Sequence, residues 1–194
     1  RKASELNPNL AGPYATLGTI AVDYEWRWRD AENLFRRAMA LNPNHPFVHA
    51  RYSRLLSLEG RHDDAVREAK LADMLSPVST VIAGALGQSL FYARRYGEAL
   101  EQFRKSLVLD PAYDSGRRSA VRTLALLGRF PEAWKEADAL QPLSKRSPEY
   151  AALRVWVLAR EGRTAEAKAL ANEAARASSI SAAGALAALG DAEE

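Results

Sequence analysis

The chain has 194 residues, of which 47% are hydrophobic and 26% are charged, and its formal net charge is +3. This composition is ordinary for a globular protein and excludes wholesale disorder, while so small a net charge argues against a general attraction to nucleic acid or to an anionic membrane. The sequence contains no cysteine, which excludes disulfides and thiol chemistry.

A fixed period of 34 residues organises almost the whole chain. Alanine recurs at this spacing without slippage, at Ala31, Ala65, Ala99, Ala133 and Ala167, which number repeats 1 to 5. Such a period is typical of one supersecondary unit copied along the chain, in which each copy buries its apolar face only by stacking on its neighbours. We therefore expect the function to lie on a surface and not in a sequestered pocket.

Each repeat is predicted to contain two helices. The first helices are expected at residues 11–22, 46–58, 80–93, 114–127 and 148–160. In three repeats a glycine five residues before the alanine supplies a tight turn, at Gly60, Gly128 and Gly162. In the second helix, the positions four and seven residues after the alanine share its face. Three second helices are ended by a proline, at Pro43, Pro77 and Pro111.

These columns resemble the tetratricopeptide repeat, whose signature runs W-x2-L-G-x2-Y, then A-x3-F-x2-A, then P. Repeat 1 matches the signature at Tyr14, Leu17, Gly18, Ala31, Phe35, Ala38 and Pro43. Repeat 3 matches it at Leu86, Gly87, Ala99, Phe103, Ser106 and Pro111. The resemblance covers nearly all of the chain. It implies an all-α fold, a right-handed α-solenoid of antiparallel helix pairs, with about five units and partial repeats at both ends.

Some repeats depart from this signature. Repeat 2 has Tyr52 and Ser53 at the Leu-Gly positions, and repeats 4 and 5 carry Val121 and Val155 where a small residue lets two helices approach closely. We therefore expect looser or rotated packing in repeats 4 and 5. The segment QPLSKRSP replaces the usual short junction after repeat 4, which predicts a bend of the superhelix between residues 141 and 148.

Residues 1–194 are predicted to form a single array. Both ends look cut, because residues 1–8 resemble the last turns of a second helix and residues 180–194 resemble a first helix and turn without a partner helix. We expect the chain to be a segment of a larger protein, since a solenoid usually ends in polar caps. The predicted divisions are 1–8 for a partial preceding repeat, 11–43, 46–77, 80–111, 114–147 and 148–177 for repeats 1 to 5, and 178–194 for a partial repeat 6.

Candidate catalytic or metal-binding groups are few. His45 and His49 are four residues apart, a spacing that suits two metal ligands on one helical face. However, His45 precedes a proline and is expected before the helix begins, while His49 and His62 fall in columns of large packing residues. Paired carboxylates such as Asp63 and Asp64 lie near the start of second helices, where they favour the helix dipole. No phosphate-binding loop, zinc-protease motif or nucleophile motif is present. We therefore predict no enzyme activity, no catalytic residue, no metal and no cofactor.

Residues 74–93 hold no charged side chain over about the length that spans a bilayer. They contain a proline and two glycines and coincide with a repeat boundary, so we predict a buried helix and no membrane partner. A cytoplasmic location is expected for the chain.

The segment around Trp26 and Trp28 alternates aromatic and basic residues, as a nucleic-acid platform would. Trp28, however, fills a packing column, and repeat 1 carries a one-residue insertion, so we expect Trp26 to cover a widened turn and we predict no nucleic-acid partner. The Trp-x-Trp turn also resembles one in the tetratricopeptide tails of bacterial multidomain regulators, including cyclase-type and winged-helix transcription factors.

The resemblance implies a binding surface on the first helices, whose exposed inner faces line a concave groove for an extended or helical peptide. The candidate partner-binding residues are Arg54, Gln88, Phe91, Tyr92, Arg118, Arg122, Trp156 and Arg160. Further positions on this face are Thr19, Asp23, Phe47 and Glu149. Arginine pairs with carboxylates and stacks on rings, and Tyr and Trp supply contact area, so we predict a protein or peptide ligand with acidic and apolar side chains. The alternative is that these arginines form only a solvated face, since Arg is the dominant cation throughout the chain.

Two functions remain open at this point. The first is a non-catalytic protein-interaction scaffold that binds its partner in the groove. The second is a regulatory or self-association module of a larger bacterial enzyme or transcription regulator, which would form homo-oligomers through exposed repeat edges. A chaperone-tail adaptor is disfavoured, because the asparagines that such members use to clamp a terminal carboxylate are missing: Thr19 and Arg54 stand at those positions.

Overall fold

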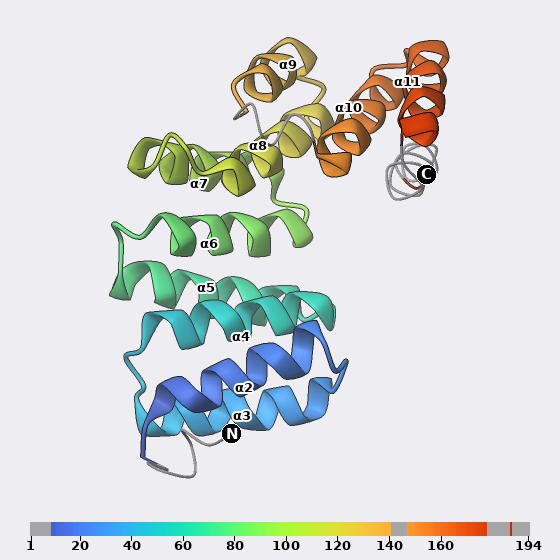
Figure 1. Cartoon of the computed structure of the whole chain (residues 1–194). Coiled ribbons are helices and arrows are strands. Elements are labelled where there is room, and N and C mark those ends of the chain that lie inside the picture. Colours follow the sequence, from blue (N-terminus) through green and yellow to red (C-terminus); the bar gives the residue numbers. More distant parts are fainter. Residues whose placement is uncertain (1–8, 141–146, 178–186, 188–194) are drawn as a thin grey trace. The chain divides into compact units, whose positions relative to one another are not determined.

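The computed structural model describes residues 9–140, 147–177 and 187, and these residues contain ten α-helices and no strand (Figure 1). The helices are α2 (Ala11–Asp23), α3 (Trp28–Leu41), α4 (Pro46–Leu58), α5 (His62–Leu75), α6 (Thr80–Tyr92), α7 (Tyr96–Leu109), α8 (Asp114–Leu126), α9 (Phe130–Asp138), α10 (Pro148–Arg160) and α11 (Thr164–Ala177). The five predicted first helices are α2, α4, α6, α8 and α10, and their ends agree with the expected ranges to within one residue. The all-α fold of helix pairs is therefore confirmed.

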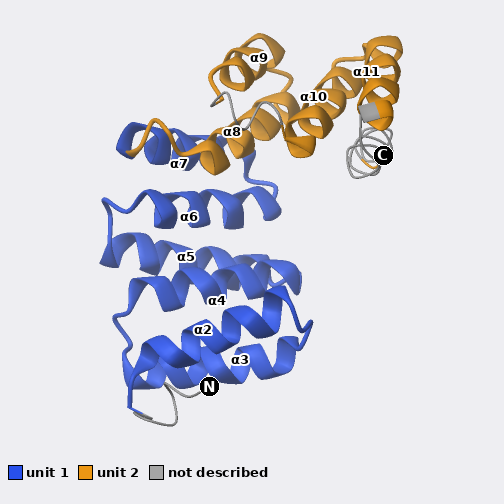
Figure 2. Ribbon diagram, viewed as in Figure 1, with its two compact units in different colours: residues 1–109 blue, residues 110–194 orange. Residues whose placement is uncertain are grey.

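The helices fall into two compact units, which Figure 2 shows in different colours. Unit 1 is residues 1–109 and contains α2 to α7, and unit 2 is residues 110–194 and contains α8 to α11. That residues 1–194 form one array, with the repeat divisions given above, stays a prediction. The predicted partial repeats at 1–8 and 178–194 lie outside the described residues, Ala187 apart, and so does most of the predicted bend.

Glycines on the first helices of repeats 1 and 3 let the second helix approach closely. A Cβ atom added at Gly18 would lie 2.9 Å from Cε1 of Phe35, and one added at Gly87 would lie 2.6 Å from Cε1 of Phe103. Both phenylalanine rings are almost fully buried, so neither has free space to move into. The glycine and the phenylalanine are therefore two halves of one contact between the paired helices.

Repeats 4 and 5 exchange the large and the small member of this contact. Val121 and Val155 stand in the glycine column, and Ala137 and Ala171 stand in the phenylalanine column. All four side chains are almost fully buried, so the same volume is divided differently between the two helices. In repeat 5, α10 and α11 approach each other over less of their length than α4 and α5 do in repeat 2. This agrees with the looser packing expected of repeats 4 and 5.

The turn between the two helices has a left-handed residue at the same place in every repeat. The residue five before the repeat alanine has a positive φ each time, in Trp26, Gly60, Arg94, Gly128 and Gly162. The N–H group of the next residue then donates to the first helix, as Arg61 does to the carbonyl of Leu56 at 2.9 Å. This is the Schellman form of helix end, in which the left-handed residue is usually glycine. Two repeats therefore place a non-glycine residue in a conformation that glycine adopts at lower cost.

The insertion in repeat 1 lengthens this turn at Trp26. The N–H of Arg27 donates to the carbonyl of Ala21 at 2.9 Å, so the bond spans one residue more than in repeat 2. We expected the Trp26 side chain to cover the widened turn, but 76% of it is exposed. Its ring lies near that of Trp28, with 6.5 Å between the centroids.

Candidate interaction surface

Arg54 is exposed on α4, but it already has a carboxylate partner. Its Nη1 atom contacts Oδ1 of Asp23, the last residue of α2, in an ion pair that joins two first helices which pack against each other. A ligand carboxylate would have to compete with Asp23 for this arginine. An exposed pair of this kind contributes roughly 0–1 kcal/mol to stability, so the competition is not costly.

Three candidate residues lie on α6, and two of them form an aromatic group near its end. Phe91 is half-buried, with its ring edge-on to Tyr96 of α7 at 5.5 Å between centroids and to Tyr92 at 6.1 Å. Tyr92 is exposed, and Gln88 is half-buried one turn earlier on the helix. Phe91 therefore belongs partly to the packing of repeat 3, while Tyr92 offers its ring to solvent.

The neighbouring first helices α4 and α6 expose apolar side chains at matching positions. Phe47 and Val81, near the helix starts, are 45% and 46% exposed, and Leu58 and Tyr92, at the helix ends, are 38% and 40% exposed. Because α4 and α6 pack against each other, each pair comes from equivalent places on adjacent helices. Arg54 lies between the two apolar ends of α4. Unit 1 thus has two exposed apolar contact areas, one formed by Phe47 and Val81 and the other by Leu58 and Tyr92, and Arg54 lies between them along α4.

The other four candidates lie on the paired first helices of unit 2. Arg118 and Arg122 are on α8, and Trp156 and Arg160 are on α10. The guanidinium carbon of Arg160 lies 5.6 Å from the centre of the half-buried Trp156 ring, within the range of a cation–π contact. The eight candidates are therefore divided equally between the two units, and a single groove that contains all of them stays a prediction.

Arg118 is half-buried in unit 2 and acts on a carboxylate of α10. The pKa of Glu149 is lowered, chiefly by hydrogen bonds from its own backbone amide and from Ser147, and further by the charge of Arg118. The charge of Arg118 thus acts on Glu149, although less than the hydrogen bonds to this carboxylate do.

A recurring arginine was missed in the sequence analysis. The pattern R-x-x-[DE]-A ends at the repeat alanine in all five repeats, and in each the arginine contacts the acidic residue three positions later. The pairs are Arg27–Asp30, Arg61–Asp64, Arg95–Glu98, Arg129–Glu132 and Arg163–Glu166. The carboxylates lie in the first turn of the second helix, where they also favour the helix dipole. The 34-residue spacing of this pattern was visible in the sequence. Because the arginine forms the same ion pair in every repeat, we assign these arginines a role in stabilising the fold and not in binding a ligand.

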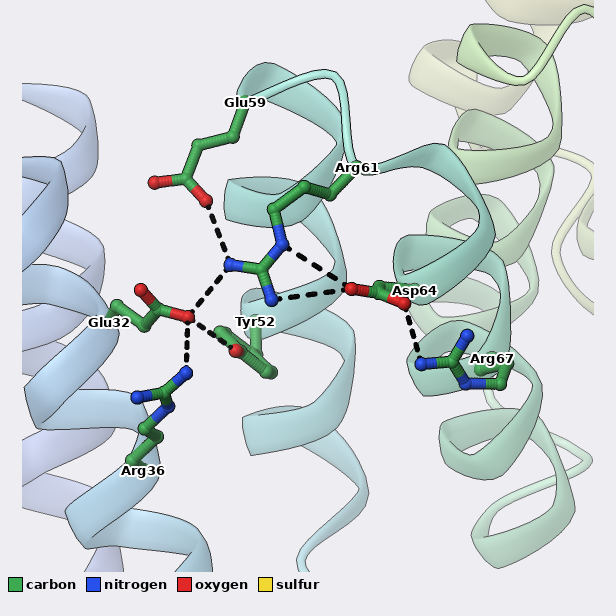
Figure 3. Close-up of polar contacts among 7 residues, drawn as sticks. All are labelled: Glu32, Arg36, Tyr52, Glu59, Arg61, Asp64 and Arg67. Atoms are coloured by element: carbon green, nitrogen blue, oxygen red, sulfur yellow. Dashed lines mark hydrogen bonds and ion pairs between the residues drawn. The ribbon is translucent and has the colours of Figure 1, made fainter.

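Around Arg61 these pairs extend into a network that joins repeats 1 and 2 (Figure 3). Glu32 on α3 accepts hydrogen bonds from the Tyr52 hydroxyl at 2.9 Å, from Arg61 at 2.8 Å and from Arg36 at 2.9 Å. The bond from Arg61 is the main cause that lowers the pKa of Glu32, while burial is the main cause that raises the pKa of Tyr52. The network ties α3 to α4 and to the start of α5.

The two histidines that are four residues apart lie in different parts of repeat 2, His45 in the junction before α4 and His49 on α4 itself. His45 precedes α4, and the two ring nitrogens of His49 each lie 2.7 Å from an oxygen, one of Glu68 and one of Pro43. Within the described part of the chain, no group of three His, Cys, Asp or Glu side chains is placed to hold a metal ion. No helix among these residues has both the length and the apolar character that crossing a bilayer requires.

Helix pairs with a 34-residue period, a glycine–phenylalanine contact inside two of the pairs and a Schellman turn between the helices define an α-helical repeat fold of the tetratricopeptide class. The chain has the tetratricopeptide-repeat fold, and the comparisons with known proteins agree with this. No family model matches the chain. It is 35% identical over 78 residues to the small glutamine-rich tetratricopeptide repeat-containing protein 2 of Mycosarcoma maydis, a match that covers 40% of this chain and 22% of that protein.

Several solved structures have the same fold. PilF of Pseudomonas aeruginosa has a TM-score of 0.71 at 21% identity, with 91% of this chain and 80% of that chain covered. A tetratricopeptide-repeat protein of Thermus thermophilus has a TM-score of 0.76 at 20% identity, with coverage of 92% and 98%. YrrB, described as having an unusual peptide-binding site, has a TM-score of 0.62 at 16% identity, with 88% of each chain covered.

Proposed function

We propose that this chain is a non-catalytic scaffold that binds a peptide, or a segment of a partner protein, on the face lined by its first helices. The observation that carries the proposal is the pair of exposed apolar contact areas on α4 and α6, with Arg54 between them. Patches that combine apolar area, an aromatic ring and arginine are typical of reversible protein interfaces. The peptide-binding site named for YrrB, a protein of the same fold, supports the same use of the fold here.

The spacing along α4 suggests the ligand. Phe47 and Leu58 are eleven residues apart, which at 1.5 Å per residue is about 16 Å along the helix axis. An extended peptide covers this distance in about five residues. Arg54 lies about two-thirds of the way from Phe47. The proposed ligand therefore has two apolar side chains about five residues apart, with an acidic side chain between them that displaces Asp23 from Arg54.

The test selects binding peptides from a random library on the purified chain and measures their dissociation constants by fluorescence polarisation. The groove variant is Phe47→Ser with Tyr92→Ser. The matched control is Met74→Ser with Val108→Ser, because these apolar side chains are at least as exposed, 78% and 82%, but lie on the second helices α5 and α7. We expect the groove variant to lose binding and the control to keep it. Equal affinity of both variants would refute the groove proposal.

The charge of the ligand has its own test, because Asp23 and Arg54 give opposite variants. Removing the competitor with Asp23→Asn frees the arginine and should tighten binding of an acidic peptide by up to about fivefold, the equivalent of about 1 kcal/mol. Arg54→Gln should weaken it. If Asp23→Asn and Arg54→Gln leave the affinity unchanged, the arginine is only part of a solvated face.

A second candidate function, a regulatory or self-association module of a larger bacterial enzyme or transcription regulator, is favoured by one observation at the α2–α3 turn. Tyr24 and Trp26 are 79% and 76% exposed, beside an open depression that is lined by Leu17, Ile20 and Leu34 and also by the Glu25–Arg27 ion pair. Apolar area of this kind at an edge suits contact between copies. Sedimentation measures the mass of the chain in solution. If this function is correct, the parent chain has the mass of a dimer and Trp26→Ser has the mass of a monomer. If it is not, the parent chain is a monomer at all concentrations.

A further inference from the structure

The imidazole of His49 is buried where three segments of unit 1 meet. His49 lies on α4, and its side chain is 6% exposed. Its Nδ1 atom lies 2.7 Å from Oε2 of Glu68 on α5, and its Nε2 atom lies 2.7 Å from the carbonyl oxygen of Pro43 in the junction between α3 and α4. One small ring thus bridges the junction, the first helix and the second helix of repeat 2.

The chemistry of the two oxygens determines the protonation of the ring. The carbonyl oxygen of Pro43 only accepts, so Nε2 must carry a proton to make its contact. A carboxylate oxygen also only accepts, so Nδ1 must carry a proton toward Glu68. The form of His49 that satisfies both contacts is therefore the imidazolium cation.

The repeat itself supplies an independent reason to assign a cation to this position. Arg117 stands two periods after His49, and Glu136 and Pro111 stand two periods after its partners. In unit 2, Nη1 of Arg117 lies 2.6 Å from Oε2 of Glu136, and its Nη2 donates to the carbonyl of Pro111 at 2.7 Å. Arginine keeps its charge at every physiological pH. In repeat 4 the equivalent position is thus occupied by a permanent cation between a carboxylate and a carbonyl.

We propose that His49 is a proton-dependent clamp, which as the cation fastens the α3–α4 junction to α5 and releases one of the two contacts when it loses a proton. The neutral ring has a single N–H group, so either Glu68 or the Pro43 carbonyl then faces a nitrogen lone pair in a buried place. In repeat 4, Arg117 makes the equivalent two contacts, and its charge does not change with pH in the physiological range.

The electrostatic surroundings give the direction of the pH effect. Of the elements packed against α4, α5 contributes the charge that acts on the ring, Glu68, and the junction contributes the neutral carbonyl of Pro43; no charge from α2, α3 or α6 acts on it among the described residues. The hydrogen bond with Glu68 raises the pKa of His49 above its ordinary value of 6.5, against burial, which lowers it. Because the pKa is raised in the folded state, the stabilisation is complete below pH 6.5 and is lost as the pH rises through the folded pKa.

The test compares the full chain with His49→Arg, which copies the arrangement of repeat 4, and with His49→Gln, which is neutral at all pH values. Urea unfolding of each is followed between pH 5.5 and 9. We expect the unfolding midpoint of the parent to fall with rising pH in this range, and the midpoints of both variants to change less. The same fall in all three proteins would overturn the proposal.

A second measurement on the unmodified chain needs no variant to fold. Nitrogen-15 NMR shifts distinguish an imidazole that is protonated on both nitrogens from either neutral tautomer, and His45 and His62 serve as internal references. We expect both nitrogens of His49 to carry protons at pH 6. We also expect the backbone amides of His45 and His49, which donate within the junction, to exchange faster as the ring becomes neutral. A neutral His49 ring at pH 6, or exchange that does not follow its titration, would also overturn the clamp.

Discussion

The contact between Gly87 and Phe103 gives a direct test of how the paired helices pack. Replacing Gly87 by alanine puts a Cβ atom 2.6 Å from Cε1 and 2.7 Å from Cδ1 of the ring. In an isolated helix the same change would stabilise by about 1 kcal/mol, because alanine has the higher helix propensity. Here the buried ring has no space to move into, and overpacking of this kind costs about 1–3 kcal/mol. We therefore expect Gly87→Ala to lower the free energy of unfolding by about 1 kcal/mol.

Urea unfolding followed by circular dichroism measures this change, with Gly97→Ala as the matched control. A Cβ at Gly97 on α7 meets nothing within 4 Å, so the control should gain up to about 1 kcal/mol. Phe103→Ala alone should lose about 3–5 kcal/mol. Adding Gly87→Val recreates the pair of Val121 with Ala137 and should recover part of that loss. If Gly87→Ala stabilises as the control does, or if the two substitutions are strictly additive, the close approach is refuted.

Three further substitutions test the turns and the polar contacts. Arg94→Gly should raise stability by about 0.5–1 kcal/mol in urea unfolding, because a left-handed non-glycine residue costs about 1–2 kcal/mol and the freer unfolded glycine offsets part of the gain; a loss would contradict the turn geometry. Glu32→Gln should cost about 1 kcal/mol at pH 7. Arg61 lowers the pKa of Glu32 in the folded state, so the stabilisation by the Glu32 carboxylate is complete above the ordinary pKa of 4.5 and is lost as the pH falls through the folded pKa. The free energies of unfolding of the parent and the variant should therefore converge in acid and not in base. Trp134→Phe removes the hydrogen bond that the indole N–H group donates to Glu161 at 2.9 Å, and it should lower the free energy of unfolding by about 1 kcal/mol. Thermal unfolding measures this change, and an unchanged stability would contradict the hydrogen bond.

The helices were predictable because their pattern is repeated. A single first helix such as α6 has weak amphipathicity, and its sequence alone does not separate a buried helix from a membrane span. Its place in a 34-residue period, between the turn-forming residues of neighbouring repeats, fixes both its ends and its partner. Ala99 at the centre of repeat 3 is fully buried for the same reason, since the period defines the face on which neighbouring units stack.

The packing details that were not predicted depend on contacts between different positions of the repeat. Comparing the same position across the five repeats does not show which other position it contacts. Gly18 and Phe35 were each visible in the sequence, as were Val155 and Ala171, but the exchange of volume between them becomes clear only when the columns face each other in the structure. Arg94 was missed at the turn because arginine has no preference for a positive φ. There the fold imposes the conformation, and the residue adopts it at a cost.

The arginines of the candidate surface show why residue type alone did not define the site. In the free protein Arg54 forms an ion pair with Asp23, while the charge of Arg118 makes a smaller contribution to lowering the pKa of Glu149. At Arg54 an acidic ligand therefore gains only the difference between two similar ion pairs, which favours selectivity for an acidic partner more than affinity. Net affinity has to come from the exposed apolar ends, where Phe47 and Tyr92 gain contact area without breaking an internal ion pair. On this reasoning, substitutions of these two side chains should weaken binding more than loss of Arg54 does.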